Sequence, residues 1–139
     1  MMYIIPGEPT AWASHNRNGK RNFSPHYEAK KTAQWNLKIQ HGDLPLITNA
    51  IRVDFLFEMP IPKSMPKKLQ KLVDAGVKVY HTRRKDRSNC LKFAEDCLTG
   101  IVIYDDNIIC CGKTEKYYSR TPQTIIYITE INNVQRDDT

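Results

Sequence analysis

Acidic side chains recur between residues 86 and 106, and basic side chains crowd the segment before them. The stretch from Asp86 to Asp96 is followed further along the chain by the adjacent pair Asp105-Asp106, and Arg83-Arg84-Lys85 precedes it. Carboxylates hold hard cations such as Mg²⁺, which activate water, while Lys and Arg side chains steady a phosphate group. The pattern therefore predicts metal-dependent cleavage of a phosphodiester.

Composition limits the partners and the size of the fold. The chain has 139 residues, of which 40% are hydrophobic and 26% are charged, so we expect one globular domain over residues 1–139. There are 21 Lys and Arg against 15 Asp and Glu, a net charge of +6. An excess of this sign favours a polyanionic partner such as DNA.

The cysteines and the N-terminus exclude other classes of protein. The four cysteines, at positions 90, 97, 110 and 111, have no CxxC spacing and no paired histidines beside them. We therefore expect buried thiols and no zinc site. The apolar run at residues 1–6 is too short for a signal peptide, and no stretch approaches the ~20 residues of a membrane span. A cytoplasmic protein with no membrane contact is expected.

The first half of the chain should supply scaffold. The pattern predicts a strand at 3–5, a mobile basic loop at 10–23, a helix from 25 to 40, a strand at 50–58, a short helix between 66 and 76, and a strand at 77–81. Trp35 on the first helix should be buried, whereas Trp12 and Phe23 on the loop could stack on exposed bases.

Residues 88–98 form the most regular pattern in the chain. At ~100° per residue, the polar side chains of Ser88, Asn89, Lys92, Glu95 and Asp96 fall on one arc. The apolar side chains of the same segment fall on the complementary arc. This segment should therefore be a helix that packs its thiol and aliphatic face on a sheet, and Gly100 should end it.

The rest of the chain reads as strands joined by short turns. Strands are expected at 101–104, at 108–112, through residue 118, and at 124–131, with both aspartates of the 105–106 pair at a hairpin tip. The fold class is α+β, a mixed sheet with an antiparallel C-terminal meander and helices mainly on one face. A polar, disordered tail should follow at 132–139.

In order, these motifs resemble the RusA-type Holliday junction resolvases. The hallmark of that family is Asp-x-Asp-Asn-x-x-Lys, then a helix with a further Asp, then Asp-Asp at a strand end. The matching positions are Pro6-Gly7-x-Pro9, Asp86, Asn89, Lys92, Asp96 and Asp105-Asp106. The chain departs from the pattern at Ser88, where the family has its second catalytic aspartate.

The resemblance implies a homodimeric, Mg²⁺-dependent endonuclease, with Mn²⁺ as a possible substitute. Such an enzyme nicks two strands of a four-way DNA junction symmetrically in recombination and repair. Its catalytic residues carry over to Asp86, Asp106 and Lys92. From the residues themselves, Asp86 and Asp106, supplemented by Asp105 or Asp96, could hold Mg²⁺, Asn89 could orient a ligand, and Lys92 could contact the scissile phosphate.

Two basic segments are the expected DNA contacts. They are the loop residues Arg17, Lys20 and Arg21, and the run Arg83, Arg84, Lys85 and Arg87 that abuts the acidic site. Positive side chains beside a phosphodiester site guide and hold the backbone of DNA.

Each motif also has a plainer interpretation. Asp105-Asp106-Asn107 could be a solvated hairpin turn, Ser88 a helix N-cap, and Lys92 with Asp96 a surface pair. Three functions stay open at this stage: an active junction resolvase, a relative that binds branched DNA with weak or no cleavage, and a basic module for single-stranded nucleic acid or a protein.

Overall fold

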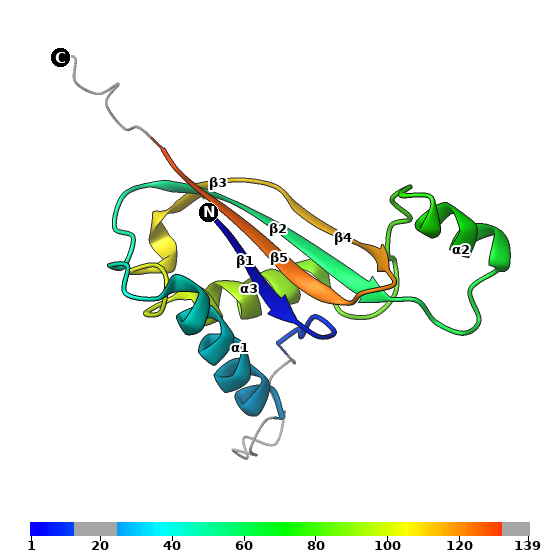
Figure 1. Ribbon diagram of the computed structural model, residues 1–139, viewed down its shortest axis with the longest axis horizontal. Coiled ribbons are helices and arrows are strands. Elements are labelled where there is room, and N and C mark those ends of the chain that lie inside the picture. Colours follow the sequence, from blue (N-terminus) through cyan, green and yellow to red (C-terminus); the bar gives the residue numbers. More distant parts are fainter. Residues whose placement is uncertain (13–24, 132–139) are drawn as a thin grey trace.

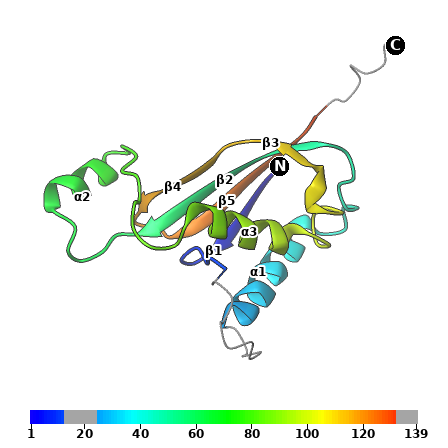
Figure 2. The same ribbon diagram turned by 180° about the vertical axis from the view of Figure 1, so that it is seen from behind.

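A computed structural model of the chain describes residues 1–12 and 25–131, and it has the expected α+β architecture (Figures 1 and 2). A mixed sheet of five strands carries helices on one side. The elements in chain order are β1 (Met2–Pro6), α1 (Pro25–His41), β2 (Ile51–Pro60), α2 (Lys67–Asp74), α3 (Arg87–Leu98), the 3-10 helix η1 (Asp106–Ile108), β3 (Ile109–Cys111), β4 (Thr114–Ser119) and β5 (Gln123–Glu130). Within these ranges no helix is long and apolar enough to cross a membrane.

The expected antiparallel meander is wrong, because the late strands do not pair with one another. β5 lies between β1 and β2 and is antiparallel to both. β3 and β4 follow one after the other along the opposite edge of β2, and both run parallel to it. The chain from β2 to β3 is therefore a crossover connection that contains α2 and α3, as parallel pairing requires.

Gly112 joins β3 to β4 at a point of very close backbone contact. Its φ is +134°, and a Cβ atom placed there would lie 1.8 Å from the carbonyl oxygen of Val53. Any other residue would force the two strands apart. The next amide, that of Lys113, donates to Oδ1 of Asp54 at 2.9 Å, which fixes the register of β4 on β2.

The core lies between one face of the sheet and the helices α1 and α3. Side chains of β2 alternate, and the buried set is Ile51, Val53, Phe55, Phe57 and Met59. The apolar side of α3 packs onto this face through Cys90, Phe93, Ala94, Cys97 and Leu98. Both the predicted two-sided character of this helix and the placement of helices mainly on one face are confirmed.

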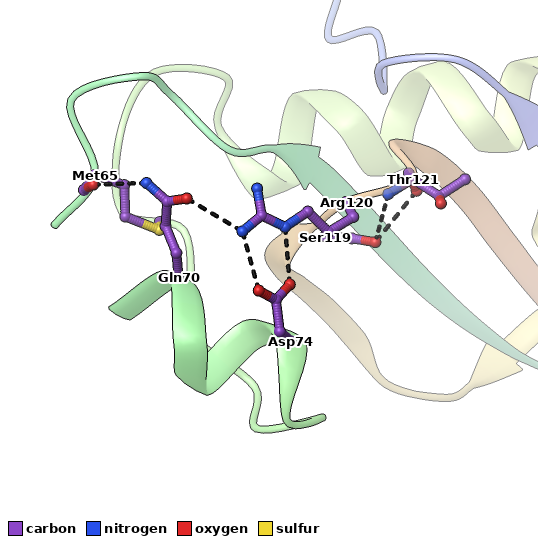
Figure 3. A network of polar contacts seen from close by, with 6 residues as sticks. All are labelled: Met65, Gln70, Asp74, Ser119, Arg120 and Thr121. Carbon is purple, nitrogen blue, oxygen red and sulfur yellow. Dashed lines mark hydrogen bonds and ion pairs between the residues drawn. The ribbon is translucent and has the colours of Figure 1, made fainter. Parts of the chain in front are cut away.

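Helix α2 lies beyond the end of the sheet and is tied to it by Arg120 (Figure 3). The Arg120 guanidinium donates to both carboxylate oxygens of Asp74, at 2.8 and 3.1 Å, and to Oε1 of Gln70 at 3.1 Å. Gln70 in turn donates to the carbonyl of Met65 at 2.8 Å. The turn between β4 and β5 thereby holds α2 in place.

Two predicted strands are not strands. The 77–81 segment makes one bridge, between Tyr80 and Tyr117, flanked by two backbone hydrogen bonds to β4. The 101–104 segment makes only single bridges at Ile103, because it turns directly out of α3. The basic loop beyond residue 12, with Arg17, Lys20, Arg21 and Phe23, and the tail at 132–139 lie outside the described residues.

Candidate nuclease site

The N-terminal end of α3 presents Asp86 and the motif that follows it. Asp86 occupies the N-cap position with φ −56° and ψ 139°, without a side-chain capping hydrogen bond. Ser88 lies inside the first helical turn, so the interpretation of Ser88 as the N-cap is wrong. Asp86, Ser88 and Lys92 are exposed, and Asn89 is half-buried. The polar face of the helix therefore opens to solvent.

Lysines build the turn that leads into Asp86. Lys85 has a positive φ of 78°, which is uncommon for a residue with a side chain. Its ammonium group donates to the Glu8 carboxylate and to the carbonyl of Pro9 at 2.8 Å. From β4, Lys116 Nζ donates to the carbonyls of Arg83 (3.1 Å) and Lys85 (2.8 Å). The strained turn is thus held by two lysines.

The basic run divides into a structural residue and exposed ones. Lys85 forms an ion pair with Glu8. An exposed ion pair of this kind contributes little to stability, but it leaves the Lys85 ammonium group less available to a phosphate. Arg83, Arg84 and Arg87 are exposed, and Arg87 Nη1 makes one long contact of 3.4 Å with the carbonyl of Thr114. These three guanidinium groups remain the candidates for DNA contact on this side.

Asp96 anchors the N-terminal segment to α3. The indole Nε1 of Trp12 donates to Asp96 Oδ2 at 2.6 Å, and the backbone amide of Trp12 donates to the carbonyl of Asn89 at 3.3 Å. The Trp12 ring packs edge-on against Phe93, with centroids 5.1 Å apart. Trp12 is therefore engaged in packing, and none of the ion pairs found within 1–12 and 25–131 joins Lys92 to Asp96.

The Asp105-Asp106 pair is not at a hairpin tip. Asp105 precedes η1 and Asp106 begins it, because the chain makes a 3-10 turn before β3. Helix η1 packs against α3, and Asp106 lies near Glu95. Burial raises the pKa of Glu95, the charges of Asp106 and Asp96 raise it further, and Lys92 opposes them.

Glu95 is a further candidate for the site, which the motif in the sequence did not single out. Its place on the polar arc, two turns after Ser88, was visible in the sequence. What was not visible is that η1 folds back beside it. The acidic group at this end of α3 therefore consists of Glu95, Asp96 and Asp106.

The candidate ligands do not form one cation site within a single chain. In the described ranges no three Asp, Glu, His or Cys side chains are arranged to hold a metal ion. Figures 1 and 2 both show the yellow segment around residues 101–111 beside the end of α3, with the green segment that leads into Asp86 at the opposite end. The metal ligation by Asp86, Asp105 and Asp106 stays a prediction.

Two expectations about burial, for the cysteines and for Trp35, are only partly met by the structure. Cys90 and Cys97 are buried, and burial raises the pKa of Cys97 to about 12. Cys110 and Cys111, however, are exposed, because β3 is a short strand at the sheet edge. Trp35 is 66% exposed on the outer side of α1, so its predicted burial is wrong.

Two comparisons relate this chain to known proteins. A protein named "Uncharacterized protein YqaN", from Bacillus subtilis (strain 168), is 27% identical over 137 residues, which is 94% of this chain and 96% of that protein. A family model described as endodeoxyribonuclease RusA matches residues 6–129, a range that contains the whole segment from Asp86 to Asp106. Because the match covers most of the chain, including both ends of α3, this protein belongs to the RusA family of endodeoxyribonucleases.

Proposed function

We propose that this chain is an endonuclease that binds four-way DNA junctions and resolves them by paired, symmetric nicks during recombination or repair. The observation that carries the proposal is the exposed N-terminal end of α3. There Asp86, Asn89 and Lys92 keep the spacing of the family motif and lie beside exposed arginines. Family membership supports nuclease chemistry on branched DNA.

The residues have separate roles in this proposal. Arg83, Arg84 and Arg87 bind backbone phosphates, and Lys92, which no ion pair found in the described chain occupies, contacts the scissile phosphate. Asp86, Asp105 and Asp106 are the proposed ligands for Mg²⁺, for which Mn²⁺ can substitute. Within the described residues of a single chain, no three such side chains are arranged to hold one ion.

Purified protein on a synthetic mobile four-way junction tests the proposal. We expect nicks in two opposed strands with Mg²⁺ or Mn²⁺, none with EDTA, and a binding preference for the junction over linear and single-stranded DNA of equal length. Light scattering should give a two-fold dimer, because one domain supplies groups for one strand only. Tighter binding of the single-stranded DNA than of the junction would favour the single-stranded binding module instead.

A second candidate function is a relative that binds junctions and cuts them poorly. Ser88 favours it, since a hydroxyl is a neutral and weak ligand where the family carries an aspartate. Tight junction binding, without nicking at any Mg²⁺ or Mn²⁺ concentration, is the result that would select this candidate.

A further inference from the structure

Helix α2 carries apolar side chains on one side, yet none of its residues is buried. Arg120 holds the helix by Gln70 and Asp74 (Figure 3). At about 100° per residue, Leu69 and Leu72 lie on the other side of the helix, and they are 36% and 39% exposed. An amphipathic helix normally turns its apolar side to a core. Within the part of the chain that the structure describes, this apolar side has no such cover.

The C-terminal end of α2 extends the apolar side by one more residue. The amide of Val77 donates to the carbonyl of Leu72 at 2.9 Å, and the amide of Gly76 donates to the carbonyl of Val73 at 3.0 Å. These two bonds make a Schellman motif, with Gly76 at a φ of +86°. The motif places Val77, which is 48% exposed, beside Leu72. Leu69, Leu72 and Val77 therefore form one exposed apolar surface, the α2 patch.

Polar contacts fix the α2 patch in place. Arg120 donates to both carboxylate oxygens of Asp74, and Gln70 donates to the carbonyl of Met65, whose own side chain is buried. Isolated helices shorter than about 12–15 residues are marginal in water, so these contacts maintain an eight-residue helix that has no buried side chain. A surface that is already ordered loses little conformational entropy when a partner binds.

The charge around the α2 patch is positive. Four exposed lysines accompany it, and none of the ion pairs found within 1–12 and 25–131 involves them: Lys63, Lys67, Lys68 and Lys71. Asp74 is the one acidic residue between positions 61 and 78, and it is paired with Arg120. Lysines in the first turn also oppose the helix dipole, which favours negative charge there. A negatively charged partner would offset both effects.

We propose that the α2 patch docks a segment of another protein, an acidic peptide that also carries apolar side chains. The apolar side chains of the peptide cover Leu69, Leu72 and Val77, and its carboxylates lie beside the lysines. The phosphate backbone of DNA would engage the lysines but would leave the leucines in water. A lipid surface fits less well, because interfacial binding scales with buried apolar area and the patch has three apolar side chains. This docking does not depend on the proposed nuclease function.

Two fluorescein-labelled decapeptides test the docking on the full-length protein. The first alternates Asp with Leu, and the second has Ser in place of each Leu, so both carry the same charge. We expect the Asp-Leu peptide to bind about tenfold more tightly by fluorescence anisotropy, because its leucines cover the patch. In NMR spectra of the ¹⁵N-labelled protein, the largest shifts should fall on α2. Absent binding of the Asp-Leu peptide, equal affinity for both peptides, or shifts centred on another element would overturn the proposal.

Leu69→Gln combined with Leu72→Gln removes the apolar side of α2 and keeps a strong helix former at both positions. About a third of each leucine is exposed, so loss of their cover should weaken binding of the Asp-Leu peptide by about tenfold and leave the Asp-Ser peptide unchanged. Ile39→Gln with Leu44→Gln is the matched control, since these side chains are exposed elsewhere and should have no effect. Val77→Ser, outside the helix, should give a smaller loss and keeps the test valid if α2 unfolds. Equal losses in the control pair and the α2 pair would overturn the proposal.

The same variants distinguish a peptide from DNA and from lipid as the occupant. Replacement of Lys67, Lys68 and Lys71 by Ala should weaken binding of the Asp-Leu peptide, most strongly at low salt. The Leu69→Gln and Leu72→Gln pair should leave binding of a four-way junction unchanged. Loss of junction binding in that pair would identify the patch as a DNA surface. Phosphatidylglycerol vesicles that bind wild type more tightly than the peptide does, and lose binding in that pair, would identify a lipid surface. Either result would overturn the proposal.

Discussion

The two ends of α3 differ in charge and in how their side chains are held. At the N-terminal end, Lys85 donates to the carbonyl of Pro9, Lys116 donates to carbonyls of the turn before Asp86, and arginines extend into solvent. At the C-terminal end, the nearby carboxylates of Asp96 and Asp106 help to raise the pKa of Glu95. The first arrangement suits a phosphate, and the second suits a cation.

This separation shows that a motif can be contiguous in sequence and divided in space. A phosphodiesterase needs both a cation and a phosphate-binding surface at one point. Here a helix about 18 Å long keeps the two apart, so the family motif by itself does not describe a complete site.

The largest effect is expected from Asp86→Asn or Asp106→Asn. Loss of a group that only supports a metal ligand costs 10–100-fold in metal affinity or activity, so loss of a ligand itself should lower nicking by more than about 100-fold. Junction affinity should stay equal or rise, because removal of a negative charge reduces repulsion of phosphate. A gel shift and a nicking assay on the same junction measure both. Unchanged cleavage in either variant would end the assignment of that residue.

Local periodicity explains why α3 was predictable and the late strands were not. The apolar side chains of residues 88–98 lie on one arc of the helix, so packing on the sheet buries all of them at once. The structure shows this packing. Strand character at 109–111 and 114–119 was also predictable, but the partner strand was not. Pairing with β2 depends on the long crossover and on the backbone contact at Gly112, which no local pattern contains.

The sequence indicated which residues belong to the candidate site better than it indicated where they lie. The motif order identified Asp86, Asn89 and Lys92 on one helix end. The expected hairpin would have put Asp106 at a strand tip, yet the chain instead forms η1 beside Glu95. Trp12 shows the same limit, because its contact with Asp96 joins residues 84 positions apart.

The arginines at the N-terminal end of α3 should bind backbone phosphates of the junction. Replacement of Arg83, Arg84 and Arg87 by Ala should weaken junction binding. The slope of the logarithm of the binding constant against the logarithm of the salt concentration should become shallower by about 0.9 for each phosphate that the variant no longer neutralises. The matched control is Lys67, Lys68 and Lys71 to Ala on α2, which removes the same charge beyond the end of the sheet. Fluorescence anisotropy over a range of salt concentrations measures both. An equal loss of affinity in the two variants would mean that only net charge matters.

Ser88→Asp should strengthen metal binding by about tenfold, the scale on which neighbouring ligand groups act. The cost to folding should be small, because the first turn of α3 contains no acidic residue and a helix N-terminus favours a negative charge. Ser88→Asn, which adds bulk without charge, is the control, and Mn²⁺ titration is the measurement. If wild type cuts rapidly in low Mg²⁺ and Ser88→Asp brings no gain, other groups already complete the coordination.

Trp12→Phe should lower the free energy of unfolding by about 1.5 kcal/mol, the low end for a hydrogen bond to a charged group, since both partners are partly exposed. The packing against Phe93 is largely kept. Trp35→Phe is the control, because Trp35 is 66% exposed and its change should stay within about 0.5 kcal/mol. Urea denaturation followed by circular dichroism compares the two, and equal losses of stability would mean that the hydrogen bond to Asp96 does not stabilise the fold.

The smallest effect concerns His81, which lies half-buried near the cations at the N-terminal end of α3. Burial lowers the pKa of His81 below 6.5, and the charges of Lys116, Lys85 and Arg83 lower it further. The folded state therefore binds a proton at His81 less readily than the unfolded chain does. Stability should fall as pH drops below about 6.5, since protonation then favours unfolding. Between about pH 7.5 and pH 5.5, Tm should fall less for His81→Gln than for wild type, because the variant has no such group to protonate. An identical fall in both proteins would mean that neither burial nor the nearby lysines and Arg83 lower the pKa of His81 in the folded protein.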